Sequence, residues 1–117
     1  MPTVDPEDMK TVWQIMKNAD ARHPGKNVVV GFDLMSRACR PGTNIESVGY
    51  RAGLLWMMCY IAPEDPRFTR DCQPDEAVFR AAAMVPAVWM GVVIVREAPP
   101  FDVKEFLRLC GEGNQIA

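Results

Sequence analysis

The segment that decides the fold is residues 50–62, YRAGLLWMMCYIA. Apolar residues in and just before it recur at spacings of three and four, the period of one helical face: Ile45, Val48, Ala52, Leu55, Cys59 and Ala62. A second apolar series lies nearly opposite: Tyr50, Leu54, Met57 and Ile61. Because Arg51 is the only charged residue of the segment, no polar face remains for water. We therefore predict a helix that is covered on every side, at the centre of a fold or between subunits.

The boundaries of this central helix are marked on both sides. Thr43 and Glu46 stand three residues apart, which is the spacing of a capping box at a helix start. The sequence Ala-Pro-Glu-Asp-Pro at 62–66 stops the helix, because proline cannot continue the hydrogen-bond ladder. A polar connector follows as far as Pro74, and we expect its aromatic residue, Phe68, to be exposed.

Three further helices are predicted from their caps and apolar spacing. The first begins with Asp5 as N-cap and Pro6 at the first helical position, and it ends before the turn at 23–25. Another opens at 74–76 and the last at 101–106, where Gly111 is the expected C-terminal glycine. The residues expected to face inward are Met9, Val12, Trp13, Met16, Ala19, Val78, Phe79, Ala82, Val85, Phe106, Leu107 and Cys110.

Two valine-rich runs are ambiguous. The spacing of apolar residues in 27–40 favours a helix capped by Asn27, although three consecutive valines also suit a strand. The run at 92–95 has the same β-branched character. We predict a mainly α fold, a compact helical bundle of about five helices around the central apolar helix. The alternative is an α+β fold with a small sheet from residues 28–32 and 91–96.

Length and composition bound the organisation of the chain. With 117 residues we expect one domain over 1–117, with a flexible tail at 112–117. When glycine is counted in place of tyrosine, the apolar share lies above the ~45–50% typical of globular proteins. The cysteines show neither a CxxC pair nor metal-ligand spacing, and no secretory leader or membrane span is recognisable. We expect a cytoplasmic, reducing location without membrane or metal.

The charges give little reason to expect nucleic-acid binding. The formal net charge is −2, so no overall field attracts a polyanion. Within the locally basic segment 22–51, three arginines could form a partner-charge patch: Arg37, Arg40 and Arg51. Without interleaved aromatic residues, such a patch suits an acidic protein better than bases that must stack.

No residue pattern predicts catalysis or a cofactor. His23 is the only histidine, and its place before Pro24 is typical of an exposed turn. The acidic pairs at 64–65 and 75–76 lie beside prolines, where capping and the helix dipole explain them. We therefore expect no catalytic residues and no cofactor, and the sequence favours a role other than an enzyme.

The expected function is binding to another protein, with self-association included. Tryptophan and methionine are frequent at interfaces, and the candidate interface residues are Trp56, Met57, Met58, Trp89 and Met90. One alternative is a small-ligand-binding protein or enzyme with a pocket between helices. The other is a nucleic-acid accessory protein that uses the basic segment 22–51.

Overall fold

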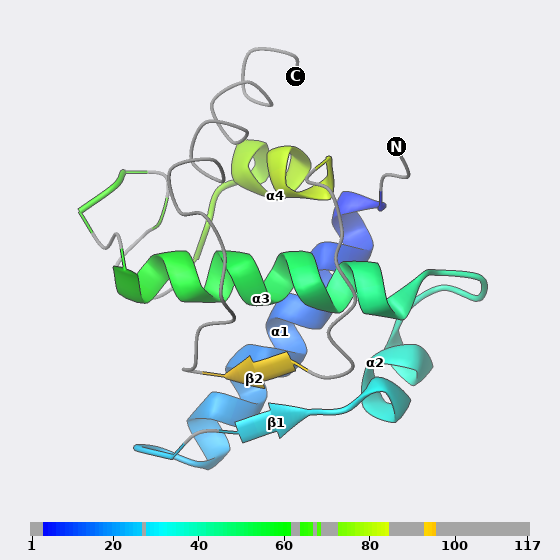
Figure 1. The fold of residues 1–117 in the computed structure, drawn as a ribbon, viewed down its shortest axis with the longest axis horizontal. Helices are drawn as coiled ribbons and strands as arrows, with labels where there is room; N and C mark the ends of the chain where they lie inside the picture. The colour runs from blue at the N-terminus through cyan, green and yellow to red at the C-terminus, as the bar shows by residue number, and fades with distance from the viewer. Residues whose placement is uncertain are drawn as a thin grey trace.

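The computed structural model describes residues 4–26, 28–61, 64–66, 68, 73–84 and 93–95, with the side chains at 28–29, 60–61 and 93–95 left out. Along the chain, the elements are α1 (Pro6–Arg22), β1 (Val28–Val30), α2 (Phe32–Ala38), α3 (Ile45–Ile61), α4 (Glu76–Ala83) and β2 (Val93–Val95) (Figure 1). The predicted mainly α fold is confirmed: these parts contain four α-helices. The last predicted helix, at 101–111, lies outside the described residues.

Helix α1 forms as its caps predict. The Asp5 side chain accepts the backbone N–H of Glu7 at 2.7 Å, and Pro6 occupies the first turn. Its predicted inner stripe is buried throughout: Met9, Val12, Trp13, Met16 and Ala19. After His23, the chain turns through Gly25, whose φ of 77° is easily reached by glycine.

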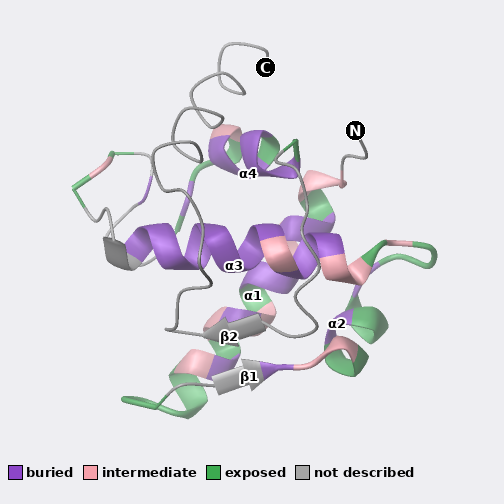
Figure 2. Ribbon diagram, in the orientation of Figure 1, coloured by how far each residue is buried: buried purple, intermediate pink, exposed green. Residues whose placement is uncertain are grey.

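Helix α3 lies at the centre of the molecule. Every residue from Arg51 to Cys59 is buried, and α1, α2, α4 and β2 all contact the helix (Figure 2). The prediction of a helix covered on all sides is confirmed for these residues. The predicted cap is wrong in its residue, because the Asn44 side chain, and not Thr43, accepts the Ser47 N–H at 3.2 Å.

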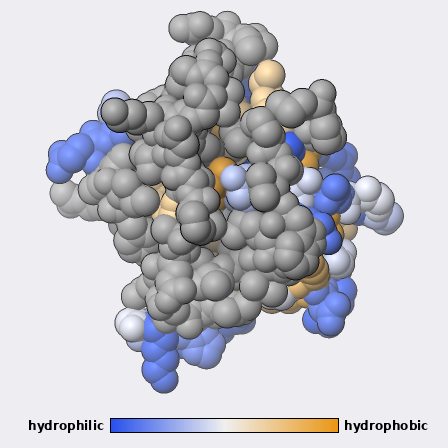
Figure 3. Space-filling view, viewed as in Figure 1, coloured by the Kyte–Doolittle hydropathy of each residue, from blue (hydrophilic) through white to orange (hydrophobic). Residues whose placement is uncertain are grey.

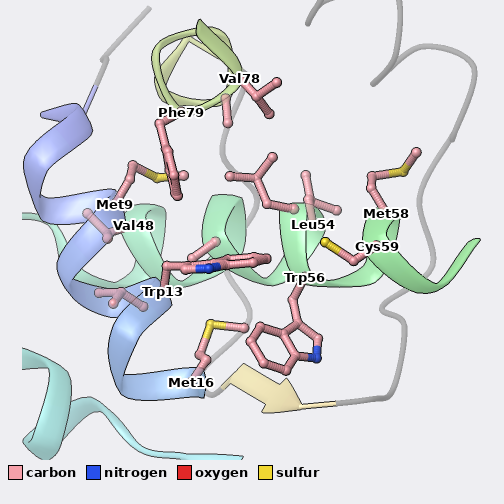
Figure 4. Close-up of a cluster of buried hydrophobic side chains, with 14 of the residues drawn as sticks. Met9, Trp13, Met16, Val48, Leu54, Trp56, Met58, Cys59, Val78 and Phe79 are labelled. Carbon is pink, nitrogen blue, oxygen red and sulfur yellow. The ribbon is translucent and has the colours of Figure 1, made fainter. Parts of the chain in front are cut away.

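The core joins three helices around Trp13. Its ring lies 5.0 Å from that of Trp56 on α3 and 6.0 Å from that of Phe79 on α4, measured between ring centroids (Figure 4). Such tilted and edge-on geometries are the favourable ones for aromatic pairs. Helix α4 is capped by Asp75, whose side chain accepts the Val78 N–H at 2.9 Å. The core therefore depends on side chains from α1, α3 and α4 together.

The two valine runs contain strands where the main prediction had none. β1 and β2 pair antiparallel, with Val28 opposite Val95 and Val30 opposite Val93. The helix predicted from Asn27 is therefore wrong at its start, since α2 begins only at Phe32. Consecutive β-branched residues favour extended backbone, and the pairing with β2 provides hydrogen-bond partners for that backbone. Three residues per strand do not make the alternative α+β domain, and the fold remains a helical one with a small ribbon at its edge.

One prediction about the connector between α3 and α4 is also wrong. Phe68 was expected to be exposed because polar residues and prolines surround it, yet only 2% of its surface is accessible. It belongs to the same buried cluster as the central residues of α3. Local polarity could not reveal this, because the burial of a connector residue depends on what the chain folds against.

Candidate functional site

A polar cleft lies where the start of α1 meets the loop between α2 and α3. Its volume is about 430 Å³, and it is lined by Val4, Asp5 and Asp8 on one side and by residues 40–44 on the other. A cleft of this size could accept a small ligand only if its polar groups were available. The hydrogen bonds and ion pairs of these polar groups therefore determine whether the cleft can bind a ligand.

Asp8 is the buried acid of this cleft, with 4% of its surface accessible. The Thr43 hydroxyl donates to its Oδ2 at 2.9 Å, and the Arg40 backbone N–H approaches its Oδ1 at 3.5 Å. A buried carboxylate needs such donors, because leaving it without them costs several kilocalories per mole. Asp8 therefore ties α1 to the loop before α3.

The exposed side chain of Arg40 lies beside the carboxylates of both Asp5 and Asp8. Its Nη2 forms an ion pair with Asp5 and lies 3.6 Å from Oδ2 of Asp8. The pKa of Asp5 is lowered by the N–H of Glu7 that it caps and then by the Arg40 guanidinium. Asp5, Asp8 and Arg40 are thus all paired with one another or with neighbouring groups. The cleft therefore connects α1 to the loop before α3, and its charged groups are not free to bind a ligand.

The three arginines of the predicted charge patch do not share one surface. Arg40 is exposed but paired with Asp5, and Arg37 is exposed on α2 with its Nε donating to the Asp33 carbonyl at 3.2 Å. Arg51 has no accessible surface, and burial lowers its pKa. Arg51 therefore cannot contribute to a surface patch, because its place on α3 is inside the fold.

The predicted interface on the central helix is also inside the molecule. Trp56, Met57 and Met58 have 3%, 5% and 0% of their surface accessible, so they pack within their own chain. In the single chain the core already uses their apolar surface, so their burial gives no support to an interface at this position. Trp89 and Met90 lie outside the described residues.

The outer edge of β1 is a different kind of site. Within the described part of the chain, β1 pairs with β2 and with no other strand. In Figure 1, β2 lies between β1 and α3, and β1 lies near the bottom of the view beside the end of α1. Neither a charged residue nor a proline interrupts Val28–Val30, although edge strands are commonly protected by such residues. On the side away from β2, the backbone N–H and C=O groups of β1 therefore face no other described strand.

Both ends of β1 carry exposed side chains. The turn before it presents Lys26, and α2 after it presents Asp33 and Leu34, whose exposed fraction of 41% is large for a leucine. In Figure 3, hydrophilic residues gather along the lower rim and the right-hand side of the view. The edge is therefore flanked by a cation at one end and by an anion and an apolar side chain at the other.

The contacts of Asp8, the burial of Arg51 and the edge of β1 differ in how far local sequence patterns indicate them. No sequence pattern indicates the ion pair and hydrogen bonds of Asp8, because the helix dipole alone explains an acidic residue in the first turn. The burial of Arg51 is indicated by such a pattern, because Val48 and Leu55 lie on one side of it on the helical wheel and Leu54 and Met58 on the other. A strand edge at β1 is predicted only by the alternative α+β fold class, which places a small sheet at residues 28–32 and 91–96.

Other features of the described residues bear on binding. None of their helices combines the length and apolar character that a bilayer crossing requires. In the same part of the chain, no group of three or more His, Cys, Asp or Glu side chains is arranged to hold a metal ion.

The comparisons with known proteins supply no relative. No family model matches the chain, no curated protein matches it, and no solved structure resembles it at a significant level.

Proposed function

We propose that this chain is a protein-interaction module that binds a β-strand of another polypeptide along the outer edge of β1. The observation that supports this most directly is the uncharged run Val28–Val30, which pairs with β2 on one side and with no described strand on the other. Strand addition uses backbone hydrogen bonds for affinity and the side chains around the strand for specificity.

The flanking residues suggest how such a partner would be recognised. Three residues offer few backbone hydrogen bonds, so a partner must gain affinity from neighbouring side chains as well. Leu34 provides an exposed apolar contact, and Lys26 and Asp33 provide opposite charges at the two ends of the strand. A partner strand with an apolar centre and one charged residue at each end fits these features.

The tryptophan and methionine residues of α3 support the module in another way. Trp56 points from α3 toward β2 (Figure 4), β2 contacts α3, and α1 contacts both strands. A strand held on a rigid helical base is pre-organised, which lowers the entropic cost of binding. The central helix is thus proposed as the support of the binding edge.

A cytoplasmic, reducing location is part of the proposal. Cys39 is a buried free thiol whose pKa is raised by burial and by the nearby Asp8 charge. A thiol of this kind is a poor nucleophile and is inert as a core residue. Such a residue suits a compartment in which thiols stay reduced.

The test uses a defined probe. A fluorescent peptide of residues 26–32, KNVVVGF, is titrated into the protein, and its anisotropy is measured. Binding is expected together with slower hydrogen exchange at the amides of β1. The control is the same peptide with N-methylated valines, which cannot donate backbone hydrogen bonds to β1. Equal binding of both peptides, or no binding of either, would contradict strand addition.

A further inference from the structure

The binding edge has a property that points to one particular occupant, and the inference rests on the proposed function. The three residues of β1 are identical, so the strand reads the same in both directions about Val29. An antiparallel pair of two such strands has a two-fold axis through Val29 and sets Val28 opposite Val30 of the second copy. Two-fold symmetric pairing is the commonest arrangement of homodimers.

The charges at the ends of the strand fit this arrangement. In the antiparallel register about Val29, Lys26 of one copy lies beside Phe32 and Asp33 of the second copy. Both Lys26 and Asp33 are exposed, and the symmetry creates the opposite-charge contact twice. A parallel arrangement would instead bring Lys26 beside Lys26 and Asp33 beside Asp33, with repulsion at both ends. The charges therefore select the antiparallel register.

The apolar residue beside the strand also gains a partner in this arrangement. Helix α2 follows the end of β1 (Figure 1). Its Leu34 is 41% exposed in the single chain. The antiparallel register brings it toward the turn at 22–26 of the second copy. Its partial burial there would add to the backbone hydrogen bonds of two short strands.

We infer that the occupant of the β1 edge is a second copy of this chain, which forms a symmetric dimer with one continuous four-stranded sheet. The order of strands in that sheet is β2-β1-β1-β2. Dimerisation would give each β1 a partner strand on the side that no described strand occupies, which protects this edge from other contacts. The small contact predicts a reversible dimer rather than an obligate one.

The first experiment is sedimentation equilibrium across a wide range of protein concentration. A monomer–dimer equilibrium is expected. Lys26→Glu and Asp33→Lys are each expected to raise the dimer dissociation constant about three- to tenfold, since each replaces two attractive contacts by repulsive ones. The double variant Lys26→Glu/Asp33→Lys restores the attraction and should return the constant to near that of the wild type. Thermal melts of the variants are measured to check that all remain folded.

Proline substitutions give a second readout. Successive backbone amides of a strand point to opposite edges, so Val28→Pro and Val29→Pro remove donors from different sides of β1. One of them is expected to abolish the dimer with little loss of stability, and the other to weaken β1–β2 pairing and lower the melting temperature. If neither changes dimerisation, the dimer uses another surface and the inference is overturned.

The outcomes separate the inference from the proposed function. A protein that stays monomeric at all concentrations but binds the 26–32 peptide uses its edge for a different chain, which overturns the dimer and leaves strand addition intact. A monomer that does not bind the peptide contradicts both. A dimer insensitive to the charge exchange overturns the antiparallel register on which the inference depends.

Discussion

Helices α1 and α3 have the same length, 17 residues, and opposite relations to water. Helix α1 buries one stripe and leaves Gln14 and Asn18 exposed, where their side chains form a hydrogen bond of 2.9 Å. Helix α3 is buried on every side over Arg51–Cys59. A helix with one apolar stripe needs neighbouring elements on one side only, whereas a helix without a polar face needs neighbouring elements on every side. Tolerance to substitution should differ accordingly.

The largest effect expected is from a charge on the inner helix. Met58→Glu places a carboxylate where no surface is accessible, and we expect it to destabilise the fold by more than about 4 kcal/mol. The matched change on the exposed face of α1, Gln14→Glu, should stay within about 0.5 kcal/mol. Chemical denaturation followed by circular dichroism measures both. Similar losses from the two variants would contradict the contrast between the helices.

The contact between the two helices comes next. Trp13→Ala removes the ring that packs against Trp56 and Phe79, with an expected loss of about 3–5 kcal/mol. Trp13→Phe keeps an aromatic ring, and Nε1 of Trp13 has no hydrogen-bond partner among the described residues to be lost. It should therefore cost only about 1–2 kcal/mol. A Trp13→Phe loss equal to that of Trp13→Ala would mean that the indole N–H has a role that the ring contacts do not explain.

A smaller effect is expected where α1 is tied to the loop before α3. Thr43→Val removes the hydroxyl that donates to the buried Asp8, which should cost about 1–3 kcal/mol. Thr43→Ser keeps the donor and serves as the control. Urea unfolding at neutral pH compares the two, and equal stabilities would show that the Asp8 carboxylate does not depend on this hydrogen bond.

The smallest effect concerns acid and the surface pairs around α1. The pKa of Asp5 is lowered from 3.8, and that of Glu76 from 4.5 chiefly by its hydrogen bond with Lys10. A lowered folded-state pKa gives stability that is present above these ordinary values and is lost as the pH falls through the folded-state values. The melting temperature should therefore decline modestly below about pH 4.5.

The matched variant for this effect is Asp5→Asn/Glu76→Gln. Asparagine still caps a helix, so the change removes charge without removing the cap. The double variant should melt slightly lower at pH 7 and show a shallower decline in acid. An unchanged acid profile would assign the decline to other carboxylates.

Much of the fold could be predicted from local signals. The start of α1 at Pro6 and that of α4 after Asp75 followed from caps, because a side chain that satisfies a helix N–H acts within three residues. The start of α3 shows the limit of such signals. Both Thr43 and Asn44 are good caps. Asn44 accepts the Ser47 N–H, whereas the Thr43 hydroxyl donates to Asp8, which lies far away in the sequence.

The candidate site was much less predictable. Trp56 and Met58 have the residue types of an interface and also those of a core, and only packing distinguishes the two. The edge of β1 exists because Val28–Val30 pairs with a segment more than sixty residues later in the chain. No local pattern specifies such a pairing, since the same valines could extend the following helix.

By itself, the sequence determined that the segment around residues 50–62 avoids water, since its two apolar faces leave no polar one. It also determined most of the helix starts, because capping is local. The tertiary structure decided that the cover for α3 comes from the chain's own α1, α2, α4 and β2. It further decided that Arg51 is buried and that β1 pairs on one side only among the described strands, because burial and strand pairing are set by contacts between distant parts of the chain.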